Sequence, residues 1–315
     1  MKRREFLGGI LAAGCLGAIE KAEASPFVKA AAKAGKAKKG RFDEDLVVFI
    51  SDLHCNPDGY QADKLAAIVD KIVSMRPLPR NVIALGDLAY LTGRTEEYER
   101  LKAILAPIGQ AGITLTLGMG NHDRRDNFKT VFPEQAAKSR MKDRLVYVVE
   151  TPKADIIVLD SLQQGEDTKT WITEGAISDD QRAWLVQTLA QYRNKPVFVS
   201  SHHPIHETAV KSELLACECC RGYLYGHDHR WRRDWFKRNY RETRIVPTLC
   251  MPSTGHWGDI GYVAFHIGED KAVAVLHEEE FFFPKPASDP AQRPAQWDMM
   301  VEDKKGAQAT FSFKG

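Results

Sequence analysis

The sequence lacks both a long apolar segment and a marked excess of charge. The apolar stretch at residues 7–19 is shorter than the roughly 20 residues that a membrane-spanning helix needs. We therefore expect no stable membrane span in the mature protein. The formal net charge is only +2, so the charge balance predicts no nucleic-acid partner. Repeats of the solenoid type are also missing, and the 43% hydrophobic content favours one globular α/β domain.

The first 24 residues have the organisation of an export signal. A pair of arginines precedes the apolar stretch, and an Ala-x-Ala cleavage pattern ends at Ala24. The arginine pair favours a twin-arginine signal over a general secretory signal. The sequence thus predicts transient binding to the twin-arginine translocation machinery, cleavage near Ala24, and a periplasmic or secreted mature protein.

Composition divides the remainder into three parts. Residues 25–43 are rich in Ala, Lys and Gly and predict a basic flexible tether, because such a composition buries little apolar surface. Contact of this tether with an anionic membrane surface is the alternative. Residues 44–283 form the predicted catalytic domain. Residues 284–315 form a proline-containing tail for which we predict no regular structure.

Cysteine is scarce, with six residues in all. Cys15 lies in the export signal, where lipidation is an alternative to cleavage after Ala24. Five cysteines would remain, and an odd number leaves at least one without an intramolecular partner; they are Cys55, Cys217, Cys219, Cys220 and Cys250. For the cluster at residues 217–220 we favour a local disulfide, with Cys250 as a candidate partner, over a metal site.

Hydrophobic periodicity in the first half predicts a β-α-β-α-β unit. Residues 46–50, 82–85 and 113–117 are apolar runs typical of buried strands. Apolar residues recur at helical spacing over 65–73, and a second helix is predicted near 96–105. This order implies parallel strands joined by right-handed crossovers.

The second half is less regular but also alternates strands with a helix. Residues 146–149 and 156–159 predict a hairpin, and Ser178 begins a helix that continues to about Gln191. Two further strands are predicted at 196–200 and 223–225. The last predicted group is an antiparallel set at 244–250, 261–267 and 272–278.

Five short clusters of His, Asp and Asn occur in a fixed order along the chain. Most of them directly follow a predicted strand, where side chains gather at one edge of a parallel sheet. The clusters are Asp52 with His54, Asp87, residues 120–123, residues 202–204 and residues 226–229. Alternation along an extended segment would also place Asp52 and His54 on one face.

In this order the clusters resemble the calcineurin-like metallophosphoesterase family, over residues 45–265. The resemblance implies an α/β fold: a four-layer α/β/β/α sandwich of two packed mixed sheets flanked by helices. Residues 120–128 resemble the class III branch of cyclic-nucleotide and glycerophosphodiester phosphodiesterases in particular.

The resemblance implies two metal ions bridged by one carboxylate. One ion would be held by Asp52, His54, Asp87 and His229, and the other by Asp87, Asn121, His202 and His227. Nitrogen and oxygen ligands without thiolates admit iron, manganese or zinc.

The resemblance also implies catalytic roles for two neighbouring residues. His122 would donate a proton to the leaving oxygen or stabilise its charge, and Asp123 would orient His122. The plainer interpretation of Asp123 is a residue that caps a turn.

Three residues are candidates for contact with the substrate: Asn121, His203 and Arg124. His203 would either support the ligands or face the substrate, and Arg124 could bind a phosphate oxygen. Tyr90 occupies the place of an iron-binding tyrosine in purple acid phosphatases, but His54 makes that ligand unnecessary, so packing is favoured. His256 could line the site, but a turn residue is the favoured prediction.

Together these features predict an exported enzyme that hydrolyses a small-molecule phosphodiester with a metal-activated hydroxide. A phosphomonoesterase similar to purple acid phosphatase is the first alternative. A non-catalytic metal-binding protein on the same fold is the second.

Overall fold

The computed structural model describes residues 42–167, 170, 172–192, 194–237, 244–279 and 307–314. The predicted export signal lies outside the described residues, as do nearly all of the tether and most of the tail. Among the described residues, no helix combines the length and the apolar character needed to cross a membrane.

The first sheet contains the predicted β-α-β-α-β unit. Its strands follow the order β12-β11-β10-β1-β2-β3, with bounds β1 (Phe42–Ile50), β2 (Leu78–Ala84), β3 (Thr114–Leu117), β10 (Gly261–Ile267), β11 (Lys271–Glu278) and β12 (Gln308–Ser312). Strands β1, β2 and β3 are parallel, and the other pairings are antiparallel. Helices α2 (Tyr60–Ser74) and α3 (Thr95–Gln110) make the crossovers. The predicted parallel unit is confirmed.

The second sheet is also mixed. Its order is β4-β5-β6-β7-β9-β8, with bounds β4 (Tyr147–Glu150), β5 (Asp155–Val158), β6 (Val197–Ser200), β7 (Cys220–Tyr225), β8 (Arg232–Phe236) and β9 (Val246–Cys250). The predicted hairpin is confirmed as β4 and β5. The prediction that β9 joins β10 and β11 in one antiparallel set is wrong, because β9 pairs with β7 and β8 instead.

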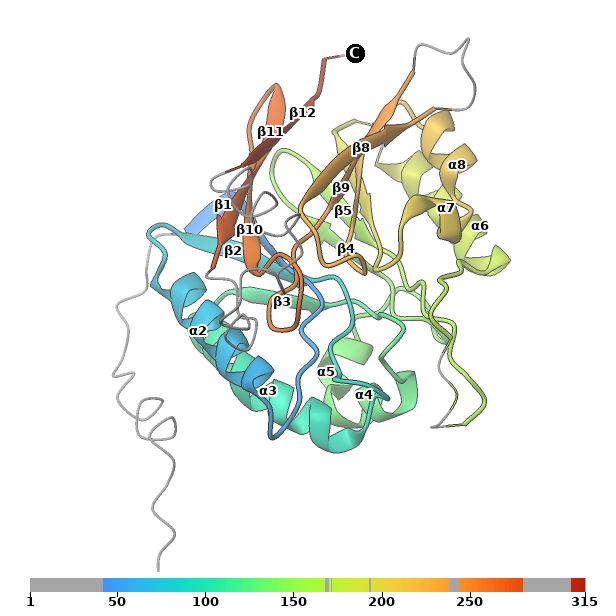
Figure 1. The fold of residues 1–315 in the computed structure, drawn as a ribbon. Coiled ribbons are helices and arrows are strands. Elements are labelled where there is room, and N and C mark those ends of the chain that lie inside the picture. The colour runs from blue at the N-terminus through green and yellow to red at the C-terminus, as the bar shows by residue number, and fades with distance from the viewer. Residues whose placement is uncertain are drawn as a thin grey trace, which may run out of the picture. The chain divides into compact units, whose positions relative to one another are not determined.

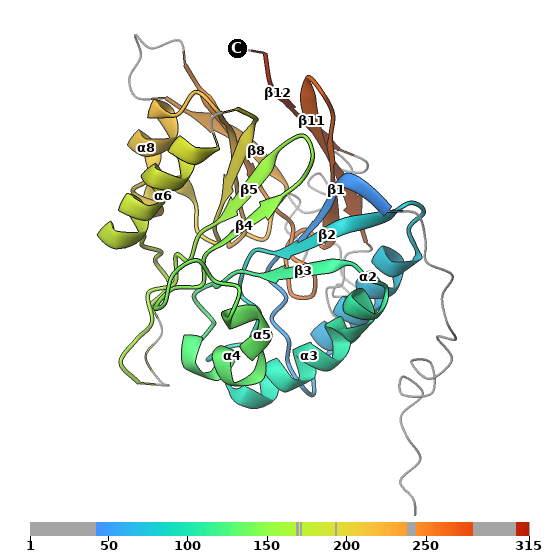
Figure 2. The same ribbon diagram turned by 180° about the vertical axis from the view of Figure 1, so that it is seen from behind.

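The two sheets pack face to face through aromatic side chains. The ring of Phe198 on β6 lies 4.9 Å from that of Phe265 on β10 and 5.4 Å from that of Phe311 on β12, edge to face in both cases. Helices α2 and α3 cover the outer side of the first sheet, as Figures 1 and 2 show. Helices α6 (Asp179–Gln191), α7 (Ile205–Thr208) and α8 (Lys211–Ala216) lie outside the second sheet (Figure 1). The four-layer α/β/β/α sandwich is confirmed.

Three local features differ from what the sequence predicts. Strand β12 lies within the proline-containing tail and forms an edge of the first sheet. Its alternate residues Ala309 and Phe311 are buried, and the Phe311 ring contacts Phe198 of the second sheet. An alternation this short does not stand out in the sequence. Short helices α4 (Arg125–Val131) and α5 (Pro133–Ala136) follow β3. A local disulfide does form, but it joins Cys217 to Cys219, and Cys250 is a buried free thiol.

Candidate metal centre

The predicted ligands meet where strands of both sheets end. Each lies within three residues of the end of its strand or in the loop that follows: Asp52 and His54 after β1, Asp87 after β2, Asn121 after β3, His202 after β6, and His227 and His229 after β7. All of these side chains are buried except His227, which is half-buried. The sandwich therefore brings together seven residues that are separated by up to 177 positions in the sequence.

Five of the seven candidate ligands have a backbone in the left-handed conformation. Positive φ angles occur at Asp52 (52°), His54 (41°), Asp87 (48°), His227 (68°) and His229 (53°). Non-glycine residues rarely adopt this conformation, and it is typical of functional sites held by their surroundings. Asp52 and His54 both face the site, as predicted. The segment that carries them is not extended, however, so the predicted reason for this is wrong.

The first group of ligand atoms contains two imidazoles that face each other. The Nε2 atoms of His54 and His229 are 3.2 Å apart. The Nδ1 atom of His54 donates to the Tyr90 carbonyl at 3.1 Å, and that of His229 donates to the Trp257 carbonyl at 2.9 Å. Because Nδ1 carries the proton in each ring, both Nε2 atoms present lone pairs to the same space. A cation in that space would bind both lone pairs. Metal-binding histidines typically donate their other ring N–H to a carbonyl in this way.

Two carboxylates complete this first group. Asp52 Oδ1 lies 3.2 Å from His229 Nε2, and Asp87 Oδ2 lies 3.5 Å from His54 Nε2. The ligand atoms of these four residues all lie within 4.8 Å of one another. Two carboxylates and two imidazoles are a donor set that suits a first-row transition metal.

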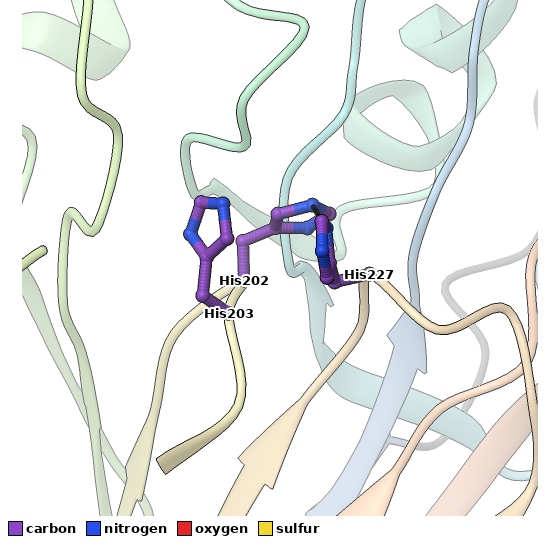
Figure 3. Close-up of side chains that lie close together, drawn as sticks. All are labelled: His202, His203 and His227. Carbon is purple, nitrogen blue, oxygen red and sulfur yellow. Dashed lines mark hydrogen bonds between the residues drawn. The ribbon is translucent and has the colours of Figure 1, made fainter. Parts of the chain in front are cut away.

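The second group lies on the other side of Asp87. Asn121 Oδ1 is 3.1 Å from His202 Nε2 and 3.0 Å from His227 Nδ1, and Asp87 Oδ2 is 3.2 Å from His202 Nε2. Figure 3 shows His202 and His227 approaching from the loops that follow β6 and β7. The residues present therefore fit two ions, with Asp87 facing both groups.

Electrostatics within the site are consistent with this fit. Burial lowers the pKa of His54 to about 3, so that its ring is neutral and free to bind a cation. Burial opposes a charge on His202, but the carboxylates of Asp87 and Asp52 outweigh it and raise its pKa to about 9. For Asp87, the surrounding imidazoles, His202 first, outweigh burial and hold the pKa well below its usual range. The carboxylates of Asp52 and Asp87 thus favour positive charge in the site, which protons supply when no metal is bound.

His203 lies close to His202 and His227, as Figure 3 shows, but both of its ring nitrogens have other partners. The Nε2 atom donates to the Thr173 carbonyl at 3.0 Å, and Nδ1 lies 2.7 Å from Ser161 Oγ. These contacts favour a supporting role, in which His203 fixes the loop that carries His202. They do not favour the substrate-facing interpretation.

His122 is positioned at the edge of the site by a backbone carbonyl. Its Nδ1 atom donates to the Leu91 carbonyl at 2.9 Å, its backbone N–H donates to Asp87 Oδ1 at 2.9 Å, and its Nε2 atom lies 4.0 Å from Asp87 Oδ2. The ring is partly exposed, with 15% of the side chain accessible. His122 can therefore present Nε2 to a group that is bound over Asp87.

Asp123 connects two loops of the site, which fits its plainer interpretation, and its role in orienting His122 stays a prediction. It accepts hydrogen bonds from the backbone of Leu88 (3.2 Å), Ala89 (3.0 Å) and Gly120 (2.8 Å), and from the Tyr98 hydroxyl (3.0 Å). It thereby ties the loop of Asp87 to the loop of Asn121. The Leu91 carbonyl accepts the hydrogen bond that orients the His122 ring.

Arg124 and Tyr90 also make contacts that the sequence did not predict. The Arg124 guanidinium donates to the Asp167 carbonyl at 2.5 Å and reaches the Gly165 carbonyl at 3.5 Å, so it braces the loop after β5. Tyr90 serves the site through its carbonyl, which orients His54. The Tyr90 ring lies edge to face with the His256 ring, with centroids 5.9 Å apart, and packing stays the favoured prediction for it.

Two residues of the loop after β9 line the site: His256, for which a turn is the favoured prediction, and Trp257, which is not predicted to lie there. The His256 ring lies 4.4 Å from the His54 ring, and the Trp257 ring lies 4.5 Å from the His229 ring. The signal in the sequence is their place in the loop that follows β9 (Val246–Cys250). Burial lowers the pKa of His256 to about 4.

Comparison with known proteins gives a consistent result. The model of the family described as calcineurin-like phosphoesterase matches residues 46–231. A Rhodopseudomonas palustris protein named "Probable cyclic nucleotide phosphodiesterase" is 30% identical over 48% of this chain and 52% of its own length. The glycerophosphodiester phosphodiesterase of Enterobacter lignolyticus is 26% identical over 55% of this chain and 62% of its own length. The chain thus spans just over half the length of the curated relatives that it matches.

Among solved structures, a dimetal phosphatase from Danio rerio aligns with a TM-score of 0.59 at 16% identity. The alignment covers 74% of this chain and 95% of that one. At this identity the similarity establishes the fold alone.

Proposed function

The chain belongs to the calcineurin-like phosphoesterase family, and on that premise we propose that it is a metal-dependent hydrolase of phosphodiesters. The observation that carries the proposal is the position of Asp87. Its Oδ2 atom lies 3.5 Å from His54 Nε2 and 3.2 Å from His202 Nε2. One carboxylate atom thus faces both groups of ligand atoms, as a bridge between two ions must.

The residues of the chain have separate tasks in this proposal. Asp52, His54, Asp87 and His229 would hold one ion, and Asp87, Asn121, His202 and His227 the other. Bound there, the ions would supply Lewis acidity, which makes a water nucleophilic at neutral pH and polarises a phosphoryl oxygen. His122 Nε2 lies beside Asp87, where it can donate a proton to a departing alkoxide. The nitrogen and oxygen donors admit iron, manganese or zinc.

The preference for diesters is supported by the relatives, which are named as phosphodiesterases. The phosphomonoesterase alternative depended on Tyr90 as a metal ligand. Its carbonyl accepts the hydrogen bond from His54 Nδ1, and His54 already supplies the nitrogen ligand. No contact of the described residues therefore favours the monoesterase over the diesterase.

Export by the twin-arginine route, and hence a periplasmic or secreted location, remains part of the proposal. The arginine pair and the Ala-x-Ala pattern of residues 22–24 support it. That route carries folded proteins, which suits a protein that binds metal before export. Replacing both arginines with lysine and following the protein by cell fractionation tests this step: export should stop.

The activity is tested with two model substrates. Purified mature protein is stripped with a chelator, metals are titrated back, and hydrolysis of bis(4-nitrophenyl) phosphate is compared with that of 4-nitrophenyl phosphate. The proposal predicts a preference for the diester that metal restores and Asp87→Ala abolishes. A preference for the monoester would support the phosphatase instead, and two bound metals without hydrolysis of either substrate would contradict the proposed activity on simple aryl esters.

A further inference from the structure

Trp257 is unusually exposed for a large aromatic residue that lies directly beside a candidate metal ligand. About half of its surface is accessible (49%), although its ring lies 4.5 Å from the ring of His229. His256 lies next to it, with ring centroids 6.5 Å apart, and contacts His54 at 4.4 Å. Exposed apolar surface at the edge of a polar site is typical of ligand binding.

The loop that carries both rings is held firmly against the ligand segments. Ser253 Oγ donates to the Asp52 carbonyl at 2.9 Å, and the Thr254 N–H donates to the Ser51 carbonyl at 2.8 Å. At the other end, the Asp259 N–H donates to the His229 carbonyl at 2.8 Å. The loop is thus tied to the first and the last metal-binding motifs at once.

The Trp257 backbone adds a further restraint, because its carbonyl accepts the hydrogen bond from His229 Nδ1. Gly258 allows the turn that follows: its φ is +95°, and a Cβ at that position would overlap the carbonyl of His229. The ring is therefore placed before any ligand arrives, and a ligand that stacks on it loses little affinity to ordering the loop.

We propose that Trp257, with His256 beside it, binds a planar aromatic group attached to the phosphoester, such as an aryl ring or a nucleobase. The inference rests on the proposed function, since it places the phosphoryl group at the metal ligands. Aromatic rings stack favourably on tryptophan, and such stacking tolerates any flat π-system. The surface would therefore select for the class of alcohol in the substrate, while Asp87 and the histidines act on its phosphorus.

Binding of matched pairs of non-hydrolysed ligands tests the inference separately from catalysis. Metal-loaded protein is titrated calorimetrically with phenylphosphonate and with methylphosphonate, which differ only in the ring. A second pair, the phosphonate analogues of adenosine 5′-monophosphate and ribose 5-phosphate, distinguishes a nucleobase from a simple aryl group. We expect Trp257→Ala to weaken binding of the ring-bearing ligand of each pair about tenfold, which is typical of a lost stacking contact. The affinity for the ligand without the ring should not change.

Trp235→Ala is the matched control, because Trp235 is similarly exposed (52%) but lies on β8 and contacts none of the candidate ligands. It should change neither affinity. Metal content is measured for each variant. Equal binding of phenylphosphonate by Trp257→Ala and the parent would overturn the inference. Equal loss of both phosphonates would also overturn it, because Trp257 would then only shield His229.

Failure of the inference can be told apart from failure of the proposed function. If Asp87→Ala abolishes hydrolysis while Trp257→Ala binds aromatic ligands normally, the proposed activity is supported and the proposed aromatic site is refuted. The opposite result is that the metal-loaded parent protein hydrolyses no ester, but Trp257→Ala no longer prefers phenylphosphonate over methylphosphonate. The proposed aromatic site is then supported and the proposed activity is refuted.

Discussion

Gly226 and Ser51 lie so close together that a side chain on Gly226 would overlap the hydroxyl of Ser51. A Cβ there would also come within 2.7 Å of Asp52 Oδ2. These residues directly precede the ligands His227 and Asp52, so the close approach of the two loops sets the distance between the first and the last motifs.

Gly226→Ala should therefore damage the metal centre. Ser51 and Asp52 are fully buried and cannot move aside freely, so we expect at least a tenfold loss of metal affinity and a lower melting temperature. Isothermal titration and thermal unfolding measure both. Gly109→Ala is the control: a Cβ there meets nothing within 4 Å, and alanine in helix α3 should stabilise by up to about 1 kcal/mol. Unchanged metal affinity in Gly226→Ala would show that the loops adapt.

Metal binding should release a proton at neutral pH. In the metal-free site Asp87 and Asp52 raise the pKa of His202 to about 9 despite its burial, so the ring is charged at pH 7 and must lose its proton to bind an ion. Affinity should consequently rise with pH up to about 9 and fall on acidification. Calorimetry at pH 7 in buffers of different ionisation enthalpy counts the protons. An enthalpy that does not depend on the buffer would exclude this exchange.

Removal of metal should also lower stability, because ions that bind only the folded state stabilise it by mass action. Metal at 100 times its dissociation constant contributes about 2.7 kcal/mol. The melting temperature should therefore fall when a chelator is added to the parent protein. In Asp87→Ala the same treatment should have little effect, and a parent protein that is insensitive to chelation would argue against buried metal.

His122→Ala should slow hydrolysis without changing metal content. The ring contributes a proton at the leaving group, and general acid catalysis is typically worth about 10²- to 10⁴-fold. The loss should be larger for a diester with an alkyl leaving group than for one that releases 4-nitrophenolate, which departs without a proton. Equal losses on the two substrates would instead indicate that His122 only binds the phosphoryl group.

Asp123→Ala should affect stability first. It leaves the N–H groups of Leu88, Ala89 and Gly120 without their buried acceptor, at a cost of about 1–3 kcal/mol for each unsatisfied group. Tyr98→Phe removes one hydrogen bond to the same carboxylate and should cost about 1 kcal/mol. Denaturant unfolding measures both. A variant of Asp123 with normal stability and no activity would instead support the orienting role that the sequence predicts.

The sequence predicts the fold and the gathering of the candidate ligands at one site, because both depend on features that are local in the chain. Apolar runs mark the buried strands β1, β2 and β6, and the carboxyl ends of such strands gather at one edge of a sheet. Asp52, Asp87 and His202 could therefore be placed before their contacts were known. The other candidate ligands were assigned from the order of the motifs along the chain.

What the sequence did not predict depends on contacts between distant segments. The backbone is left-handed at Asp87 and His229, a conformation that Asp and His adopt more often than most residues, but the residue types alone do not locate it. Asp123 is adjacent to His122 in the chain, yet its hydrogen bonds run to the loop after β2. Trp257 reaches His229 only because β9 and β7 pair in the second sheet.

The most direct test is an anomalous-scattering map of crystals grown with the metal that supports the highest activity. The proposed site predicts two peaks on either side of Asp87, one among Asp52, His54 and His229, and one among Asn121, His202 and His227. A single peak, or a second ion bound by His203 in place of Asn121, would contradict a pair of ions bridged by Asp87.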